Sequence, residues 1–273
     1  MNAVVFVGGG RITGALLAGL RLAGNRTPII VHDRNAHKLR ALRREYGVRV
    51  EHELAPAVAK ASVLMIAVRP ASMAETLDQI RAARLISSTS HKKTAPLIAC
   101  SLAAGIPLAK LRARLDRPVL WARAMPSPGA RTRLGLTALT FERQFPTAAR
   151  ATLKKFFRQV GPVLEIAESK FDAFTVTFSP SHGYHALATL AHAGQKLGLD
   201  RRTAIAAATH ALGDAIVSWR QGKDSLDDLL HEAATPGGIA ATVMRSMDSA
   251  AYPRIVERSL RAGVARARKN ASL

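Results

Sequence analysis

Cysteine is almost absent from this sequence of 273 residues, which contains only Cys100. A single cysteine excludes an intramolecular disulfide and any metal site built from several thiolates. This use of cysteine fits a reducing compartment, and we expect Cys100 to be a buried apolar residue. The spacing of histidines and carboxylates suggests no metal site either.

Long apolar runs are also missing. No stretch reaches the ~18 residues of a membrane-spanning helix, although 48% of the residues are hydrophobic. The chain enters a strand-like run almost at once, without the charged segment and cleavage site of a secretory signal. We therefore expect a cytoplasmic protein that has a packed core and binds no membrane.

Acidic residues are scarce. The 19 Asp and Glu residues face 40 Lys and Arg residues, which gives a formal net charge of +21 and suggests nucleic-acid binding as one hypothesis. However, the basic residues are dispersed over stretches with a helical pattern, and aromatic residues that could stack on bases make up only 5%. We expect no nucleic-acid partner, and we expect the positive field to attract an anionic cofactor instead.

The most informative stretch is a β-prone run that leads directly into three glycines. Val4–Val7 predicts a strand, and the apolar pattern after residue 11 predicts a helix. Between them, Gly8 and Gly10 leave backbone N–H groups and a helix N-terminus open to a pyrophosphate. Thr13 replaces the third glycine of the G-x-G-x-x-G pattern, so an ordinary buried turn remains the alternative. We interpret the stretch as a dinucleotide-binding turn.

A second strand-like run, residues 28–32, ends at Asp33 and Arg34, close to the expected position of a ribose-contacting residue. Arg34 and Arg11 could bind the 2′-phosphate and the pyrophosphate of NADPH. Asp33 argues the other way, because a carboxylate there can hold the ribose 2′-hydroxyl of NADH. We predict NADP as the cofactor, with NADPH preferred and NAD possible.

Strand-like and helix-like segments alternate as far as residue 166. Further strands are expected at residues 48–50, 63–68, 97–102, 119–122, 136–140 and 163–166. Helices are expected at residues 36–46, 56–61, 73–83, 108–115 and 148–160, and a polar loop at residues 87–93. This alternation predicts an α/β fold with a Rossmann-type, doubly wound, mostly parallel sheet that binds ligands at the carboxyl ends of its strands.

Beyond residue 166 the strand signals cease, and alanine-rich helical stretches follow. They cover residues 186–196, 201–221, 226–234, 238–247 and 253–269. We predict a dinucleotide-binding Rossmann domain over residues 1–165 and an all-α dimerisation and substrate domain over residues 166–273. The apolar helix faces predict a homodimer or higher homo-oligomer, although they could instead pack onto the sheet.

Six motifs resemble those of the pyrroline-5-carboxylate reductase family, in the family's order. The family's F-I-G-x-G-N-M is similar to residues 6–12, its A-V-K-P to Ala67–Pro70, its A-A-G-I to residues 103–106 and its R-x-M-P to residues 123–126. In the helical half, A-D-A-G-x-K-x-G-L resembles residues 191–199, and S-P-G-G-T-T resembles residues 235–240. The resemblance therefore spans nearly the whole chain.

This resemblance implies a Rossmann domain, a helical dimerisation domain interleaved with its partner, and hydride transfer from a reduced nicotinamide to a cyclic imine. The expected cofactor-binding positions are Gly8, Gly10, Arg11, Ile12, Asp33, Arg34, Ala67, Val68, Arg69 and Pro70. The expected substrate-binding positions are Met125, Ser181, His182, Thr235, Gly237, Gly238, Ile239 and Thr242. We assign no catalytic residue, because a protonated imine is already electrophilic and mainly needs to be positioned.

The sequence departs from the family where the substrate is expected. Ile239 stands where the family has a threonine whose hydroxyl helps to hold the substrate carboxylate. The family's M-P-N-T-P is one residue shorter here and lacks its Asn, and the family's S-G-S-G-P-A-Y is altered around Ser181 and His182. We therefore expect poor reduction of pyrroline-5-carboxylate and a preference for a larger or less polar imine.

Two other functions stay open at this point. One is a carbonyl reductase like the related hydroxyacid dehydrogenases, which would need a positioned lysine such as Lys196 for proton transfer. The other is a nucleotide-binding protein without turnover. His182 and His185 are further candidates for proton transfer, although a single histidine on a helix is more often structural.

Overall fold

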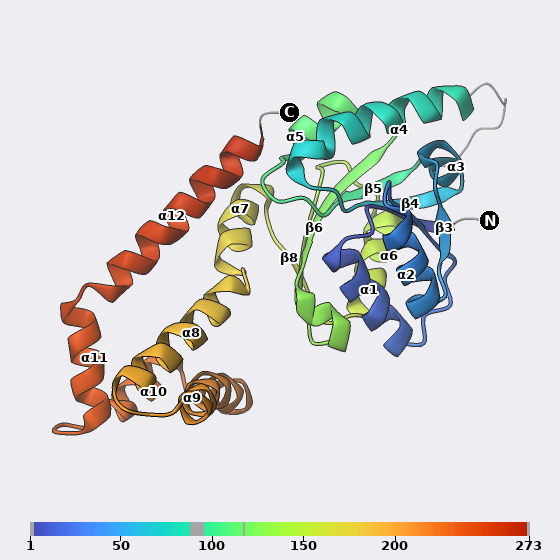
Figure 1. Ribbon diagram of the computed structural model, residues 1–273. Coiled ribbons are helices and arrows are strands. Elements are labelled where there is room, and N and C mark those ends of the chain that lie inside the picture. Colours follow the sequence, from blue (N-terminus) through green and yellow to red (C-terminus); the bar gives the residue numbers. More distant parts are fainter. Residues whose placement is uncertain (1–2, 88–95, 117, 272–273) are drawn as a thin grey trace. The chain divides into compact units, whose positions relative to one another are not determined.

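The structure is a computed structural model that describes residues 3–87, 96–116 and 118–271 (Figure 1). It divides into two compact units, which we describe separately. The sheet unit comprises Met1–Phe178 and Ala262–Leu273, and the helical unit comprises Ser179–Arg261. Of the predicted polar loop at residues 87–93, only Ser87 lies within the described residues, and there it ends a helix.

The sheet unit contains eight strands in the order β3-β2-β1-β4-β5-β6-β7-β8. Neighbouring strands are parallel except β6 and β7, which are antiparallel. The strands are β1 (Ala3–Val7), β2 (Ile29–His32), β3 (Arg49–Glu51), β4 (Ala61–Ile66), β5 (Ile98–Ser101), β6 (Leu120–Pro126), β7 (Thr137–Phe141) and β8 (Val163–Glu165). The strand order reverses between β1 and β4, which is where ligands bind in open α/β sheets.

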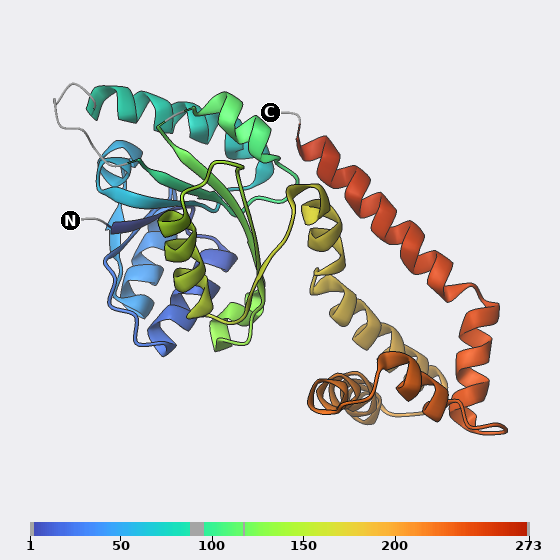
Figure 2. The same cartoon turned by 180° about the vertical axis from the view of Figure 1, so that it is seen from behind.

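Helices cover both faces of this sheet. They are α1 (Arg11–Leu22), α2 (Ala36–Tyr46), α3 (Leu54–Ala59), α4 (Met73–Ser87), α5 (Leu108–Arg114) and α6 (Thr147–Arg158), with the 3₁₀ helices η1 (Pro70–Ser72) and η2 (Pro128–Thr132). In β1, Phe6 packs with residues of α1, α2 and α6, whereas Val5 packs with residues of α3, α4 and α5. Figure 2 shows α6 lying along the strands. The predicted doubly wound, Rossmann-type sheet is confirmed.

The local sequence explains why these elements begin and end where they do. The residues of β1 and β2 are all buried, as expected for parallel strands that are covered on both faces. At the start of α2, the Asn35 side chain accepts a hydrogen bond from the Lys38 N–H at 3.1 Å. At its end, Gly47 adopts the left-handed conformation that commonly terminates a helix.

Two segments of the predicted helical domain belong to the sheet unit. One is α7 (Glu168–Thr177), a helix that the sequence analysis did not predict, and it contacts β7. The other is the end of α12 (Tyr252–Asn270), which approaches Gly105 so closely that a Cβ there would lie 2.3 Å from the Ala267 carbonyl oxygen. These compact units divide the chain at other positions, and the domain division after residue 165 stays a prediction.

The helical unit contains α8 (Ser181–Lys196), α9 (Arg201–Gln221), α10 (Leu226–Ala233), α11 (Ile239–Ser249) and the first part of α12. All five predicted helices are confirmed, although α8 begins at Ser181, five residues earlier than predicted. At the start of α9, Asp200 accepts hydrogen bonds from Thr203 and from the Arg202 N–H, and these bonds lower its pKa.

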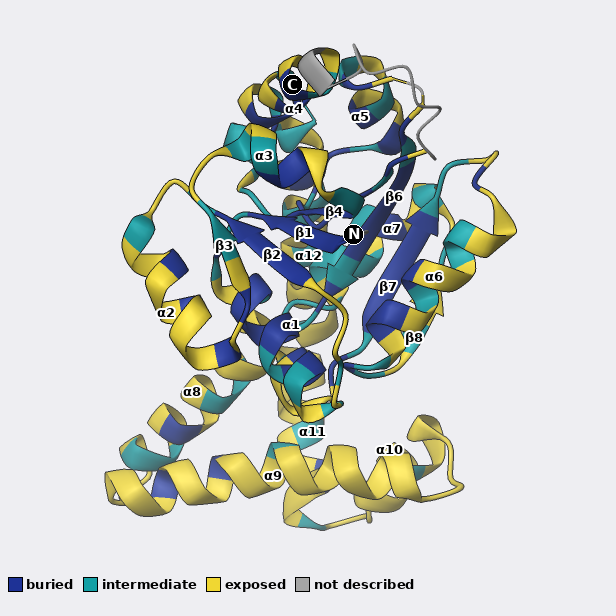
Figure 3. Ribbon diagram, turned by 90° about the vertical axis from the view of Figure 1, so that its right-hand side faces the viewer, coloured by how far each residue is buried: buried dark blue, intermediate teal, exposed yellow. Residues whose placement is uncertain are grey.

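Small residues form the buried part of the helical unit. Ala191 of α8 and Ala204 and Ala208 of α9 are buried, whereas many of the larger apolar side chains lie at the surface. Figure 3 shows α9 as largely exposed. The exposed apolar residues include Leu190, Leu197, Ile205, Ile216, Val217, Trp219, Leu230, Ile239, Val243 and Ile255. In the part of the chain that the structure describes, no helix is both long and apolar enough to span a membrane.

Candidate functional site

The glycine turn between β1 and α1 is held tightly by its neighbours. Gly8 has φ of +106°, a conformation that side-chain-bearing residues rarely adopt. A Cβ at Gly8 would lie 2.7 Å from the carbonyl oxygen of Ala67, directly after β4. The Gly8 N–H also donates to the His32 carbonyl at the end of β2, at 2.8 Å. The turn is therefore fixed between the carboxyl ends of β2 and β4, and residue 8 must be glycine.

The start of α1 is open to a ligand. Gly10 is the N-cap, no side chain caps the helix, and no acidic residue lies in the first turn. No heavy atom lies within 4 Å of where a Cβ on Gly10 would be, so there is free space above the helix N-terminus. Arg11, the first residue of α1, is exposed. The uncapped backbone N–H groups at the start of α1 and the free space beside them can accommodate the pyrophosphate of a dinucleotide.

Thr13, which replaces the third glycine of the motif, strengthens the turn. Its side chain is buried, and its Oγ1 donates to the Gly8 carbonyl at 2.6 Å. The departure from the motif therefore adds a hydrogen bond between the helix and the turn. The structure accommodates threonine at this position without opening the turn.

Asp33 has a structural role that the sequence analysis missed. Its Oδ2 accepts a hydrogen bond from the Gly9 N–H at 2.7 Å, and its Oδ1 accepts one from the Asn35 N–H at 2.8 Å. Lys38 Nζ lies 3.7 Å from Oδ2. The carboxylate thus ties the glycine turn to the loop after β2, and each of its oxygens already has a backbone donor.

The remaining cofactor candidates also lie at the carboxyl ends of the strands. Arg34 is exposed and forms an ion pair with Glu75 at 3.2 Å. The Ala67 N–H donates to the Val7 carbonyl at 2.8 Å, which places Ala67–Pro70 beside the glycine turn. The structure thus brings Gly8, Asp33 and Ala67 together at the carboxyl ends of β1, β2 and β4, where the strand order reverses.

The substrate-binding candidates divide between the two units. Met125 lies half-buried on β6 of the sheet unit. In the helical unit, Ser181 and His182 are exposed in the first turn of α8, and the Ser181 Oγ lies 2.7 Å from the Ser179 Oγ. His185 Nδ1 lies 3.4 Å from Thr189 Oγ1 on the same helix.

The other substrate candidates surround the start of α11. Gly238 is the N-cap, no side chain caps the helix, and Ile239 is its first residue with 87% of its surface exposed. The Thr235 Oγ1 donates to the Glu232 carbonyl at 3.2 Å, and the Thr242 Oγ1 donates to the Gly238 carbonyl at 3.1 Å. The helix N-terminus can still bind an anion, but both neighbouring threonine hydroxyls already donate their hydrogen bond to a backbone carbonyl.

Lys196, His182 and His185, the candidates for proton transfer, are all exposed on α8. We therefore continue to assign no catalytic residue. Among the residues that the structure describes, no group of three His, Cys, Asp or Glu side chains could hold a metal ion. Cys100 is fully buried, and desolvation raises the pKa of its thiol, as expected for an unreactive core cysteine.

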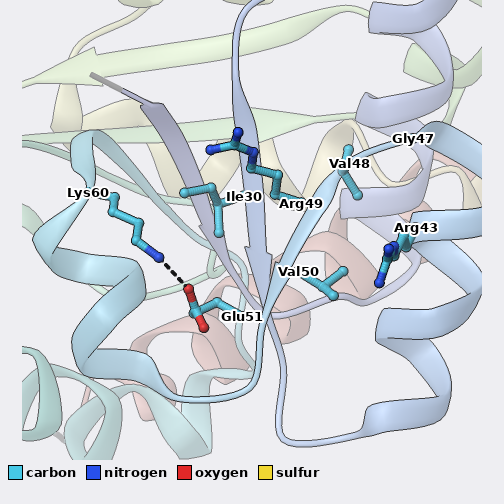
Figure 4. Close-up of a pocket in the computed structure, with 8 residues that line it drawn as sticks. All are labelled: Ile30, Arg43, Gly47, Val48, Arg49, Val50, Glu51 and Lys60. Carbon is cyan, nitrogen blue, oxygen red and sulfur yellow. Dashed lines mark hydrogen bonds and ion pairs between the residues drawn. The ribbon is translucent and has the colours of Figure 1, made fainter. Parts of the chain in front are cut away.

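A hollow of about 510 Å³ lies elsewhere, around β3 at the edge of the sheet (Figure 4). Its lining includes an ion pair between Lys60 Nζ and Glu51 Oε2, which are 2.6 Å apart. The lining residues are Ile30, Arg43, Gly47, Val48, Arg49, Val50, Glu51 and Lys60. None of the predicted cofactor or substrate positions lines this hollow.

A buried ionic cluster at Arg123 was also missed by the sequence analysis. Arg123 lies on β6 with only 1% of its side chain exposed, and it donates to Glu168 at 2.9 Å and to Asp172 at 3.0 Å. Its guanidinium carbon lies 4.4 Å from the centre of the Phe171 ring. Glu168 also accepts from the Leu108 N–H at the start of α5. The cluster fixes α7 to β6 and α5, which is a structural role.

Two family models match this chain in separate regions. The model described as NADP oxidoreductase coenzyme F420-dependent matches residues 3–91, which include the glycine turn. The model described as pyrroline-5-carboxylate reductase dimerisation matches residues 168–270. These two matches support the resemblance to the pyrroline-5-carboxylate reductase family that the sequence motifs indicated.

Family members that are similar to this chain match it over almost their whole length. The pyrroline-5-carboxylate reductase of Corynebacterium melassecola is 29% identical, and the match covers 91% of both chains. That of Mycobacterium tuberculosis is 27% identical over 97% of this chain and 96% of the relative.

Solved structures of the same family share the fold. The Plasmodium falciparum pyrroline carboxylate reductase with NADP bound has a TM-score of 0.85 and 17% identity, covering 99% of this chain and 98% of that one. The Coxiella burnetii pyrroline-5-carboxylate reductase has a TM-score of 0.84 and 22% identity, covering 100% and 99%.

Proposed function

We propose that this protein is an NAD(P)H-dependent reductase that transfers hydride to the C=N bond of pyrroline-5-carboxylate or a related cyclic imine, a reaction of proline synthesis. One observation carries the proposal. The glycine turn is tightly packed at Gly8 and has free space at Gly10, where a pyrophosphate can bind. It occurs in a chain that is similar to pyrroline-5-carboxylate reductases over nine-tenths of its length. We also propose a cytoplasmic location, because the free, buried Cys100 fits a reducing compartment.

The chain's own residues would act mainly by binding and orientation. A reduced nicotinamide, when bound, supplies the hydride. The N–H groups at the start of α1 hold the pyrophosphate, and the N–H groups after Gly238 at the start of α11 hold the substrate carboxylate. Because a protonated imine is already electrophilic, holding it in place provides most of the rate enhancement.

The proposed cofactor is NADPH in preference to NADH. Arg34 is exposed at the corner after β2, where a guanidinium can bind the 2′-phosphate. Asp33 would favour NADH if its carboxylate were free, but each of its oxygens already accepts a backbone hydrogen bond. Its capacity to hold a ribose hydroxyl is thereby reduced, which supports NADPH.

Among cyclic imines, we propose a preference for one that is larger or less polar than pyrroline-5-carboxylate, because Ile239 removes a hydroxyl from the carboxylate-binding position. Thr235 and Thr242 do not replace that hydroxyl, since both donate to backbone carbonyls. Losing one hydrogen bond to a charged group weakens binding by roughly 1.5–3 kcal/mol, or about one to two orders of magnitude.

Replacing Ile239 by threonine should therefore lower the KM for pyrroline-5-carboxylate by about tenfold or more, with a smaller change in kcat. Ile239→Val is the matched control, because it keeps the β-branch and adds no hydroxyl. Steady-state kinetics with both variants test this prediction. If the wild type has ordinary efficiency on pyrroline-5-carboxylate and the added hydroxyl does not improve it, other residues bind the carboxylate and the prediction is wrong.

Two alternative functions are tested by one assay. A carbonyl reductase of the hydroxyacid dehydrogenase type would oxidise NADPH in the presence of keto acids. A nucleotide-binding protein without turnover would bind NADPH but would not oxidise it, whichever substrate is added. We expect oxidation with cyclic imines at a rate well above that with keto acids. Measuring nicotinamide absorbance against a panel of both classes distinguishes the three functions.

The family's dimerisation region forms a homo-oligomer, and we propose a dimer. Large apolar side chains such as Trp219, Ile216 and Leu230 are exposed in the helical unit, whose buried residues are mostly alanines. A second copy would cover this apolar surface. Light scattering at micromolar concentration should give at least twice the monomer mass. A folded monomer that still binds the cofactor would contradict the prediction.

A further inference from the structure

Arg34, the candidate for binding the 2′-phosphate, already has an acidic partner in the protein. Its Nη1 lies 3.2 Å from the Glu75 Oε1, although the two residues are 41 positions apart in sequence. Arg34 follows β2, whereas Glu75 lies in the first turn of α4. The two side chains are 71% and 56% exposed, so the pair lies in solvent at the surface of the sheet unit.

We propose that Glu75 limits the preference for NADPH by competing with its 2′-phosphate for Arg34. The inference rests on the proposed function, since it requires that a nicotinamide dinucleotide binds at the glycine turn. Glu75 itself lies outside the glycine turn and outside the expected cofactor positions. NADH has no 2′-phosphate, so its binding would not require Arg34 to leave Glu75.

The charges around this corner support competition. Lys38, a second basic residue near this loop, lies 3.7 Å from the Asp33 carboxylate, so its charge also faces a carboxylate, as that of Arg34 does. A 2′-phosphate therefore meets a corner whose positive charge is partly neutralised. An exposed ion pair is weak, and a phosphate dianion can displace it, but the displaced carboxylate remains close to the new negative charge.

Glu75 could instead have a purely local role. A carboxylate in the first turn of a helix interacts favourably with the helix dipole, and Glu75 also accepts a hydrogen bond from Gln79 Nε2 at 3.2 Å. It could also hold Arg34 in the conformation that the phosphate needs. These roles predict no effect or a loss of NADPH affinity when the charge is removed, whereas competition predicts a gain.

The variant Glu75→Gln isolates the charge, because glutamine keeps the length of the side chain and is also well suited to the first turn of a helix. The matched control is Glu165→Gln. Glu165 lies on β8 at the opposite edge of the same sheet, where it pairs with Arg150 and Lys154. The control removes the same charge from the same unit, away from the glycine turn.

The test is calorimetric titration of the full-length protein with NADPH and, separately, with NADH. We expect Glu75→Gln to tighten NADPH binding about three- to tenfold and to change NADH binding less than about twofold. We expect Glu165→Gln to change neither by more than about twofold. Arg34→Ala should weaken NADPH binding about tenfold or more, and in that background Glu75→Gln should give no gain.

The outcomes separate this inference from the proposed function. If the wild type binds both dinucleotides and Glu75→Gln binds NADPH no more tightly, Glu75 does not compete for Arg34. The proposed function is not affected by that result. A gain that persists without Arg34 also overturns the competition. A wild type that binds neither dinucleotide contradicts the proposed function itself.

Discussion

Gly10→Ala should reduce NADPH affinity by about 100-fold or more and leave the stability of the protein nearly unchanged. Gly10 has φ of −80°, which alanine adopts easily, and its Cβ would have no neighbour within 4 Å. The new methyl group would therefore enter only the space that the pyrophosphate needs. Calorimetry with NADPH and a thermal melt of the same samples measure the two effects separately.

Gly8→Ala is the matched variant, and it should lower both the affinity for NADPH and the stability of the protein. Its φ of +106° and the Ala67 oxygen at 2.7 Å make a side chain costly at this position. The backbone strain alone costs about 1–3 kcal/mol, in addition to the displacement of the turn. Normal NADPH binding by Gly10→Ala would contradict the assignment of this turn to the pyrophosphate.

Arg123→Met should destabilise the sheet unit by about 2–4 kcal/mol. Methionine fills a similar volume, but it leaves the Glu168 and Asp172 carboxylates without their cation. Both carboxylates are partly exposed, at 33% and 24%, so solvent lowers the cost below that of a fully buried charge. Urea denaturation followed by circular dichroism measures the free energy of unfolding.

A triple variant provides the control for this prediction. Adding Glu168→Gln and Asp172→Asn to Arg123→Met removes the unpaired charges and should recover at least half of the lost stability. An Arg123→Met protein as stable as the wild type would mean that the cluster contributes little to holding α7 on β6.

The elements that could be predicted from sequence are those whose residues have a strong local pattern. The apolar run of β4, the glycine turn and the Asp200-capped helix α9 each follow from their own residues, and α9 has the predicted bounds. In contrast, α7 was not predicted, because β-branched and aromatic residues fill its second half and only Phe171 is buried. Its position depends on the distant Arg123, which local sequence does not reveal.

The sequence indicated which candidate cofactor residues lie close together, but it did not indicate the contacts between them. The motif located Gly8, Gly10 and Asp33 correctly at one edge of the sheet, but it gave no sign that Asp33 binds the Gly9 N–H. The pairing of Arg34 with Glu75 was equally invisible, since it joins residues from different βα units. A charged residue within an apolar strand, such as Arg123, was the one available signal of a buried ionic cluster.

The most direct test of the central claim is the fate of the hydride. The purified protein would be incubated with pyrroline-5-carboxylate and NADPH that carries deuterium at the transferable position of the nicotinamide. We expect proline with one deuterium on the ring carbon that was part of the C=N bond, in equal amount to the NADP⁺ formed. Slow turnover would agree with the effect of Ile239. A protein that binds NADPH but forms no labelled proline from pyrroline-5-carboxylate, and no labelled amine from any other cyclic imine, would contradict the account.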